Sequence, residues 1–70
     1  MRNGTKLKQL LEICDINIAM DEGIIEITTI NKATYQKRSK EGATFSAVLD
    51  KAYRQMLKDA TMGFSDSEHQ

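Results

Sequence analysis

Residues 15–30 read Asp-Ile-Asn-Ile-Ala-Met-Asp-Glu-Gly-Ile-Ile-Glu-Ile-Thr-Thr-Ile. Apolar and polar side chains alternate along residues 15–21, and residues 24–30 are rich in β-branched side chains; both patterns are typical of β-strands. Glu22 and Gly23 stand between the two runs and form a turn signal, because glycine adopts positive φ angles without strain. This stretch therefore predicts a β-hairpin.

The register of the hairpin follows from which side chains would be buried together. With a two-residue turn, Ile18 faces Ile27 and Met20 faces Ile25, which gathers apolar side chains on one face. A three-residue turn would instead place Ile18 opposite Glu26 and give that face a mixed character. Burial favours the two-residue register, with the apolar face turned toward the core.

Residues 31–42 are open to two interpretations. As a helix they would offer only Ala33 and Tyr35 as apolar residues, which form no stripe. As a strand over 33–39, Tyr35 points inward, Arg38 points outward, and the lysines discourage edge-to-edge aggregation. We favour the second interpretation, a third strand at the edge of the sheet.

Helical periodicity marks the segments on either side. Apolar residues recur at helical spacing along residues 5–14, with Thr5 as the N-cap. The same spacing predicts a second helix over 44–61, with Thr44 as its N-cap and Gly63 as its C-terminal cap. The apolar stripe of this second helix comprises Phe45, Val48, Leu49, Ala52, Met56 and Ala60, widened by Tyr53 and Leu57.

The predicted order is α-β-β-β-α, an α+β fold in which two helices pack on one face of a small antiparallel sheet. We expect a single domain over residues 1–70, with a frayed segment at 1–4 and a polar tail at 64–70. The other face of the sheet is expected to be solvated.

The length and composition of the chain exclude several classes of protein. The chain has 70 residues and one cysteine, which excludes a disulfide framework and a four-ligand Cys/His zinc site. A haem, flavin or dinucleotide fold needs more chain than this, so we expect no cofactor. We find no signal peptide or membrane-length apolar run, and one unpaired cysteine suits a reducing compartment. The expectation is a cytoplasmic protein without a membrane partner.

A catalytic constellation is not expected either. His69 is the only histidine and lies in the polar tail, where a general base would not be held in place. Cys14 lies near the end of a predicted helix, where the helix dipole disfavours a thiolate. Asp21, Glu22 and Glu26 lack the spacing of a calcium loop and fit turn polarity better. We therefore expect a non-enzymatic protein.

Charge is unevenly distributed although the net charge is zero: residues 31–60 hold seven basic and three acidic side chains. We call six of the basic residues the basic ridge: Lys37, Arg38, Lys40, Lys51, Arg54 and Lys58. A surface of this kind can bind an acidic protein or a phosphate backbone, or can simply be a solvated face. A second candidate surface is the solvated sheet face, represented by Asn17, Glu26, Thr28 and Gln36.

Two resemblances bear on function. Residues 42–53, Gly-Ala-Thr-Phe-Ser-Ala-Val-Leu-Asp-Lys-Ala-Tyr, resemble the loop and second helix of ribbon-helix-helix repressors. In that alternative 31–41 would be the first helix, but it is about one turn short and has no apolar stripe, so we disfavour it. The architecture of residues 5–61 resembles small phage-encoded inhibitors, such as some anti-CRISPR proteins, without diagnostic residues.

These features together predict a small regulator or inhibitor that acts by binding a larger protein, and the resemblance implies a phage or mobile-element origin. A small DNA- or RNA-binding transcriptional regulator that uses the basic ridge is the alternative. Short chains often gain stability by oligomerising, so a homodimer is also left open.

Overall fold

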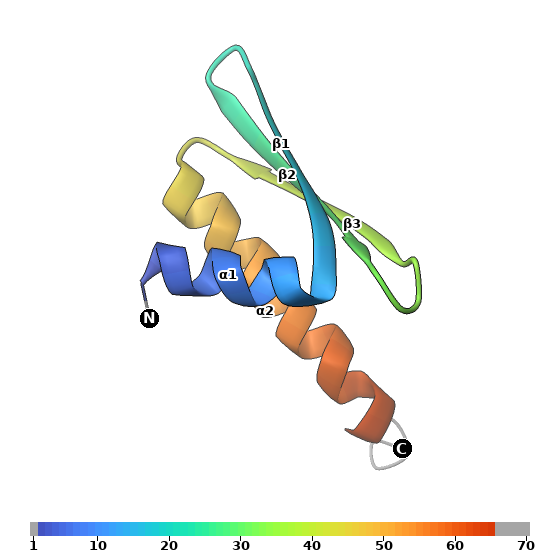
Figure 1. Cartoon of the computed structure of the whole chain (residues 1–70). Helices are drawn as coiled ribbons and strands as arrows, with labels where there is room; N and C mark the ends of the chain where they lie inside the picture. Colours follow the sequence, from blue (N-terminus) through green and yellow to red (C-terminus); the bar gives the residue numbers. More distant parts are fainter. Residues whose placement is uncertain (1, 66–70) are drawn as a thin grey trace.

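The computed structural model describes the backbone of residues 2–65 and the side chains of residues 2–60 (Figure 1). Its elements are α1 (Asn3–Ile13), β1 (Cys14–Asp21), β2 (Ile24–Asn31), β3 (Lys37–Gly42) and α2 (Phe45–Ser65). The three strands form one antiparallel sheet in the order β1-β2-β3, and both helices contact it. The predicted α-β-β-β-α fold is confirmed.

The hairpin of β1 and β2 has the two-residue turn that burial favoured. Asp21 pairs with Ile24, and Ile18 pairs with Ile27. The turn residues Glu22 and Gly23 both have positive φ angles, 52° and 78°. Such angles are those of a type I′ turn, whose twist matches the right-handed twist of the strands.

The third strand begins later than predicted, at Lys37 instead of residue 33. The reason is the side chain of Asn31. Its Oδ1 accepts hydrogen bonds from the backbone N–H groups of Ala33 and Thr34, at 2.8 and 2.9 Å. These bonds hold the chain in a tight turn, so extended pairing with β2 resumes only after residue 36.

Tyr35 lies in this turn, and its predicted inward orientation is wrong. Its φ angle is 62°, its side chain is 78% exposed, and its N–H donates to the carbonyl oxygen of Asn31 at 2.8 Å. The later start also changes which side chains of β3 face the helices. Arg38, predicted to point outward, points toward α2, whereas Lys37 lies on the other face.

The first helix begins earlier than predicted. It starts at Asn3 with Arg2 as the N-cap residue, so Thr5 lies inside the first turn and is not the cap. Part of the segment 1–4, predicted to be frayed, is therefore helical. The helix gives way to β1 at Cys14, where the backbone becomes extended (φ −130°, ψ 154°).

The second helix begins as predicted. The N–H of Ala47 donates to Thr44 Oγ1 at 3.2 Å, which is the N-cap geometry. At the other end, α2 runs through Gly63 to Ser65, so the predicted cap at Gly63 is wrong. The first residues of the predicted tail 64–70 are helical, and 66–70 lie outside the described residues.

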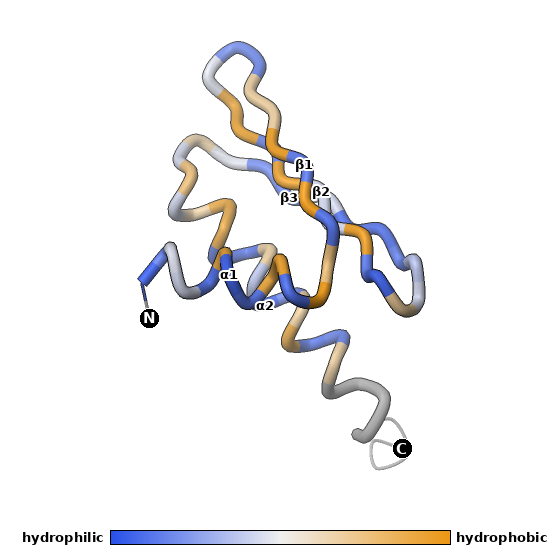
Figure 2. The backbone as a smooth tube through the Cα atoms, in the orientation of Figure 1, coloured by the Kyte–Doolittle hydropathy of each residue, from blue (hydrophilic) through white to orange (hydrophobic). Residues whose placement is uncertain are grey.

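Both helices lie on the same side of the sheet (Figure 1). Helix α2 contacts β2 and β3, while α1 contacts α2 and β1. The buried core contains Leu10, Ile27, Val48, Leu49, Ala52, Tyr53 and Met56. The β1–β2 hairpin extends beyond the helices, and hydrophobic positions continue along it there (Figure 2). The core therefore occupies only part of the helix side of the sheet.

Candidate functional site

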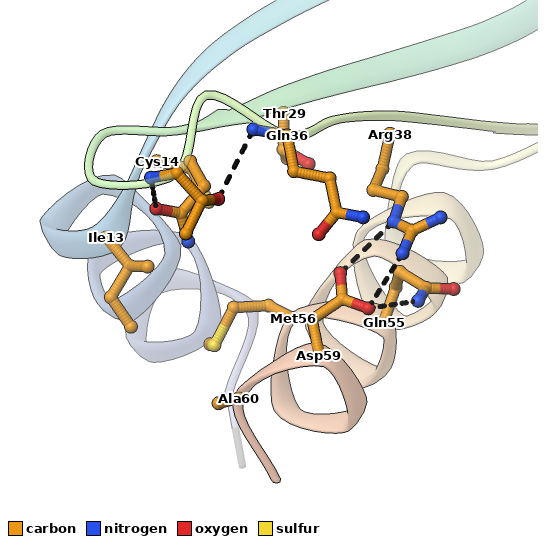
Figure 3. A pocket seen from close by; sticks show the side chains of 11 residues that line it. Ile13, Cys14, Thr29, Gln36, Arg38, Gln55, Met56, Asp59 and Ala60 are labelled. Carbon is orange, nitrogen blue, oxygen red and sulfur yellow. Dashed lines mark hydrogen bonds and ion pairs between the residues drawn. The ribbon is translucent and has the colours of Figure 1, made fainter. Parts of the chain in front are cut away.

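Two members of the basic ridge, Arg38 and Lys40, reach from β3 to α2. Arg38 donates from Nε and Nη2 to the two carboxylate oxygens of Asp59, at 3.1 and 3.0 Å (Figure 3). Gln55 donates to the same carboxylate at 2.9 Å and accepts from Lys40 Nζ at 3.1 Å. This bidentate pair and its neighbours join β3 to α2.

The electrostatics of Asp59 reflect this network. Burial alone would raise the pKa of Asp59, but the hydrogen bonds from Arg38 and Gln55 outweigh it and hold that pKa below its ordinary value. The carboxylate therefore stays ionised at neutral pH and is occupied by Arg38. It is poorly placed to act as a general base.

Lys51 and Arg54 of the basic ridge also have partners within the chain. Lys51 Nζ donates to the carbonyl oxygen of Glu41 at 3.0 Å, and Arg54 Nε lies 2.9 Å from Asp50 Oδ2. Asp50 is shared with Lys6, whose Nζ lies 2.9 Å from Oδ1. The hydrogen bond from Lys6 is the main reason that the pKa of Asp50 is lowered.

The basic ridge is therefore not one surface. Arg38 and Lys40 are directed into the contact between β3 and α2, whereas Lys37 lies on the opposite face of the sheet, in register with Ile30. Lys58 lies further along α2. Most of the basic side chains that the sequence assigned to partner binding thus contact carboxylate or amide oxygens of the chain itself.

A cavity of about 190 Å³ lies beside the Arg38–Asp59 pair (Figure 3). Cys14, Thr29 and Met56 also line it. Burial is the main reason that the pKa of the Cys14 thiol is raised, and the nearby carboxylate of Asp59 adds to the effect. A protonated, buried thiol is a weak nucleophile. Within the described part of the chain, no group of three or more His, Cys, Asp or Glu residues is arranged to hold a metal ion.

The solvated sheet face is assembled only in part as expected. Asn17 and Thr28 are register partners, and Thr28 Oγ1 lies 3.1 Å from Ser39 Oγ, so a polar row crosses all three strands. Glu26 pairs directly with Glu41 on the same face. Gln36 does not belong to this face, because it precedes β3 and lines the cavity.

The surface that sequence reasoning missed is the far half of the hairpin. The pattern predicted that Ile18 and Met20 would be buried with their partners, but they are 48% and 71% exposed. Ile27, the register partner of Ile18, is 0% exposed, and Ile25 is partly buried. On the other face, Ile24 is 44% exposed. The burial prediction is thus correct for β2 and wrong for the outer half of β1.

The exposed apolar side chains stand among carboxylates. Residues 14–31 contain four acidic side chains and no lysine or arginine. We call the exposed residues at this end of the hairpin the hairpin surface: Ile18, Met20, Asp21, Glu22, Ile24 and Glu26. The acidic residues of the hairpin are visible in the sequence. The alternating pattern does not show which of the apolar residues remain exposed to solvent.

No protein-family model, curated protein or solved structure matches this chain. Fold and surface thus define it as a small α+β protein with two helices on one face of a three-stranded sheet. None of the helices described here has the length and apolar character needed to span a bilayer.

Proposed function

We propose that this protein is a small non-enzymatic regulator or inhibitor that docks on a larger protein, with the hairpin surface as its main contact. The observation that carries the proposal is the exposure of Ile18 and Met20 on a hairpin that extends beyond the helices. Exposed apolar clusters with a polar rim are typical of protein interaction sites.

The hairpin surface also has a shape suited to recognition, because it projects beyond the helices. A projecting hairpin can enter a concave partner and present side chains from both of its faces. Ile18 and Met20 are on the helix side, and Ile24 is on the opposite side. The surrounding carboxylates would steer the protein toward a basic partner surface and improve the rate of association.

The alternative, nucleic-acid binding by the basic ridge, has less support. Phosphates would have to compete with Asp59 for Arg38 and with Asp50 for Arg54. The carboxylates of the hairpin would add repulsion. Retention on heparin or mixed DNA at low salt, with affinity falling steeply as salt rises, would favour this alternative.

The test is affinity capture with two matched double variants. One replaces the apolar hairpin residues with polar residues of similar size (Ile18→Thr with Met20→Gln). The other reverses charge on α2 (Arg54→Glu with Lys58→Glu). We expect the hairpin variant to bind the captured partner about tenfold more weakly or worse, and the α2 variant to bind it nearly as well as the original.

Thermal unfolding followed by circular dichroism is the control, because all three proteins should melt cooperatively. Loss of the partner from the α2 variant alone would contradict the assignment of the hairpin surface and return the site to the basic ridge. Equal binding by all three proteins would contradict both assignments.

A further inference from the structure

We propose that the free edge of β1 binds an extended, lysine- or arginine-bearing segment of the protein partner as a fourth strand of the sheet. This inference rests on the proposed function and names the partner's chemistry. It is carried by the unpaired edge, the exposed apolar residues beside it and the charge of the hairpin.

The edge of β1 has no partner within residues 2–65. β1 is the first strand in the order β1-β2-β3, and it is eight residues long. Its main contacts in this part of the chain are with β2 and α1. No hydrogen bond joins the outer side of residues 16–20 to another element of the described chain. An edge of this kind is a template for strand addition.

The register shows which backbone groups face outward. A two-residue type I′ turn is closed by a hydrogen-bonded pair, here Asp21 and Ile24, and such pairs alternate along an antiparallel ladder. The N–H and C=O groups of Ile16, Ile18 and Met20 therefore point away from β2. Two of these three residues also carry the exposed apolar side chains.

The opposite edge of the sheet is protected in a way that β1 is not. β3 is six residues long and reads Lys-Arg-Ser-Lys-Glu-Gly, so charged side chains stand along most of it. Lysines and other charges on an edge strand discourage further pairing. β1 reads Cys-Asp-Ile-Asn-Ile-Ala-Met-Asp and has no lysine, arginine or proline. Strand addition is therefore directed to β1.

The negative charge of the hairpin favours a basic segment over a second copy of the chain at this edge. The hairpin presents four carboxylates and no basic side chain. A second copy would bring the same four carboxylates, and a symmetric pairing centred on Ile18 would set Asp15 directly opposite Asp21 of the other copy. Like charges directly opposite each other destabilise a strand pair. A basic segment meets no such repulsion and is attracted to the edge.

The two faces of β1 define the pattern of the segment. Side chains of the added strand that lie beside Ile18 and Met20 would cover apolar surface. The alternate side chains would lie on the other face of β1, which carries a carboxylate at each end, Asp15 and Asp21, with Asn17 and Ala19 between them. The expected segment therefore alternates apolar residues with lysine or arginine. Cross-strand pairs of both kinds stabilise a sheet.

The test uses two synthetic peptides of about eight residues, the length of β1. One alternates valine with lysine, and the other alternates valine with glutamate. Each is titrated into the isotopically labelled full chain and followed by amide NMR. We expect the lysine peptide to shift the amide signals of Ile16, Ile18 and Met20 and to slow their hydrogen exchange. The glutamate peptide should leave these signals unchanged.

Two variants separate strand addition from simple charge attraction. Met20→Pro removes one outward N–H group at an edge position that tolerates proline, and Met20→Val is its matched control because it keeps that group. We expect the proline variant to bind the lysine peptide about tenfold more weakly and the valine variant to bind it within about twofold of the original. Should the proline variant fail to fold, Asp21→Lys is the second test: it should weaken the lysine peptide several-fold and admit the glutamate peptide.

Several outcomes would overturn the inference: no binding of the lysine peptide, equal binding of both peptides, shifts confined to α2, or unchanged binding by a folded Met20→Pro. If Met20→Pro does not fold, unchanged binding by Asp21→Lys would overturn it instead. Self-association in sedimentation that Met20→Pro abolishes would assign the edge to a second copy and overturn it as well. The proposed function is judged separately, since a partner captured through the hairpin surface and still bound by Met20→Pro would retain the docking role without strand addition.

Discussion

Whether Arg38 is available to a partner depends on which face of β3 carries its side chain. In a strand beginning at residue 33 with Tyr35 inward, Arg38 would point to solvent and be available to a partner. In the actual strand it faces α2 and forms two hydrogen bonds with Asp59. When the inward-facing positions of a strand shift by one residue, every side chain of that strand moves to the other face. The side chain is thereby a link between β3 and α2.

The Arg38–Asp59 pair should make the free energy of unfolding depend on pH in the acidic range. Because the folded pKa of Asp59 is below its ordinary value of 3.8, its ionised form stabilises the fold above that value. The contribution is lost as the pH falls through about 4 and then through the folded pKa. We expect Asp59→Asn to lower the free energy of unfolding at pH 7 by about 1 kcal/mol and to flatten its decline below pH 4.

Urea unfolding at a series of pH values measures this effect. Asp21→Asn is the control, because Asp21 is exposed and forms no ion pair among the described residues, so its substitution should change stability little. An equally steep acid decline in the original protein and in Asp59→Asn would contradict the role given to Asp59.

At the scale of elements, the β1–β2 turn places the hairpin surface. Glu22 and Gly23 both adopt positive φ angles, and this conformation sets both the register and the twist of the strands. The sequence predicted the turn through Gly23, although Asn or Asp is the usual residue before glycine in such turns. The β2–β3 connection differs because an asparagine side chain, and not glycine, shapes it.

Two glycine substitutions should act in opposite directions. An added Cβ would meet nothing within 4 Å at either Gly4 or Gly23. A steric clash therefore cannot cause a difference in stability between the two substitutions. Gly23 has a φ of 78°, and Gly23→Ala should cost about 1 kcal/mol through backbone strain. Gly4 lies in α1 without a positive φ, and Gly4→Ala should stabilise the protein by up to about 1 kcal/mol. Urea midpoints that shift in the same direction for both would contradict this account.

At the scale of the whole molecule, two helices are not enough to cover three strands. α2 contacts β2 and β3, and α1 lies near the start of β1. The helix side of the outer half of β1 is therefore left exposed, whereas Ile25 of β2 still packs against the core. The uncovered part coincides with the exposed Ile18 and Met20, which is why the docking proposal belongs to this end of the molecule.

Ile18 and Ile27 test this arrangement, because they are the same residue type, face the same side and pair directly with each other. Ile27→Ala should cost about 2–5 kcal/mol, since its side chain is fully buried in the core. Ile18→Ala should cost less than about 1 kcal/mol because half of its side chain already contacts solvent. Chemical denaturation measures both, and equal losses would show that the outer hairpin is packed as tightly as the core.

The sequence by itself determined the order of elements and the hairpin register. Alternation in 15–30, a glycine at the turn and apolar stripes at helical spacing are local patterns, and each depends only on residues a few positions apart. The N-cap at Thr44 was predictable for the same reason, since its hydrogen bond closes within three residues.

Only the tertiary structure decided which surfaces are free. Whether Ile18 is buried depends on how far α1 and α2 extend over the sheet, and whether Arg38 is available depends on Asp59, which is 21 residues away. Burial and ion pairing join segments that are distant in the chain, so no local pattern contains them. The same alternating pattern that buried Ile27 therefore left its partner Ile18 half exposed, because Ile27 lies in the core that the helices form with the sheet and Ile18 lies outside it.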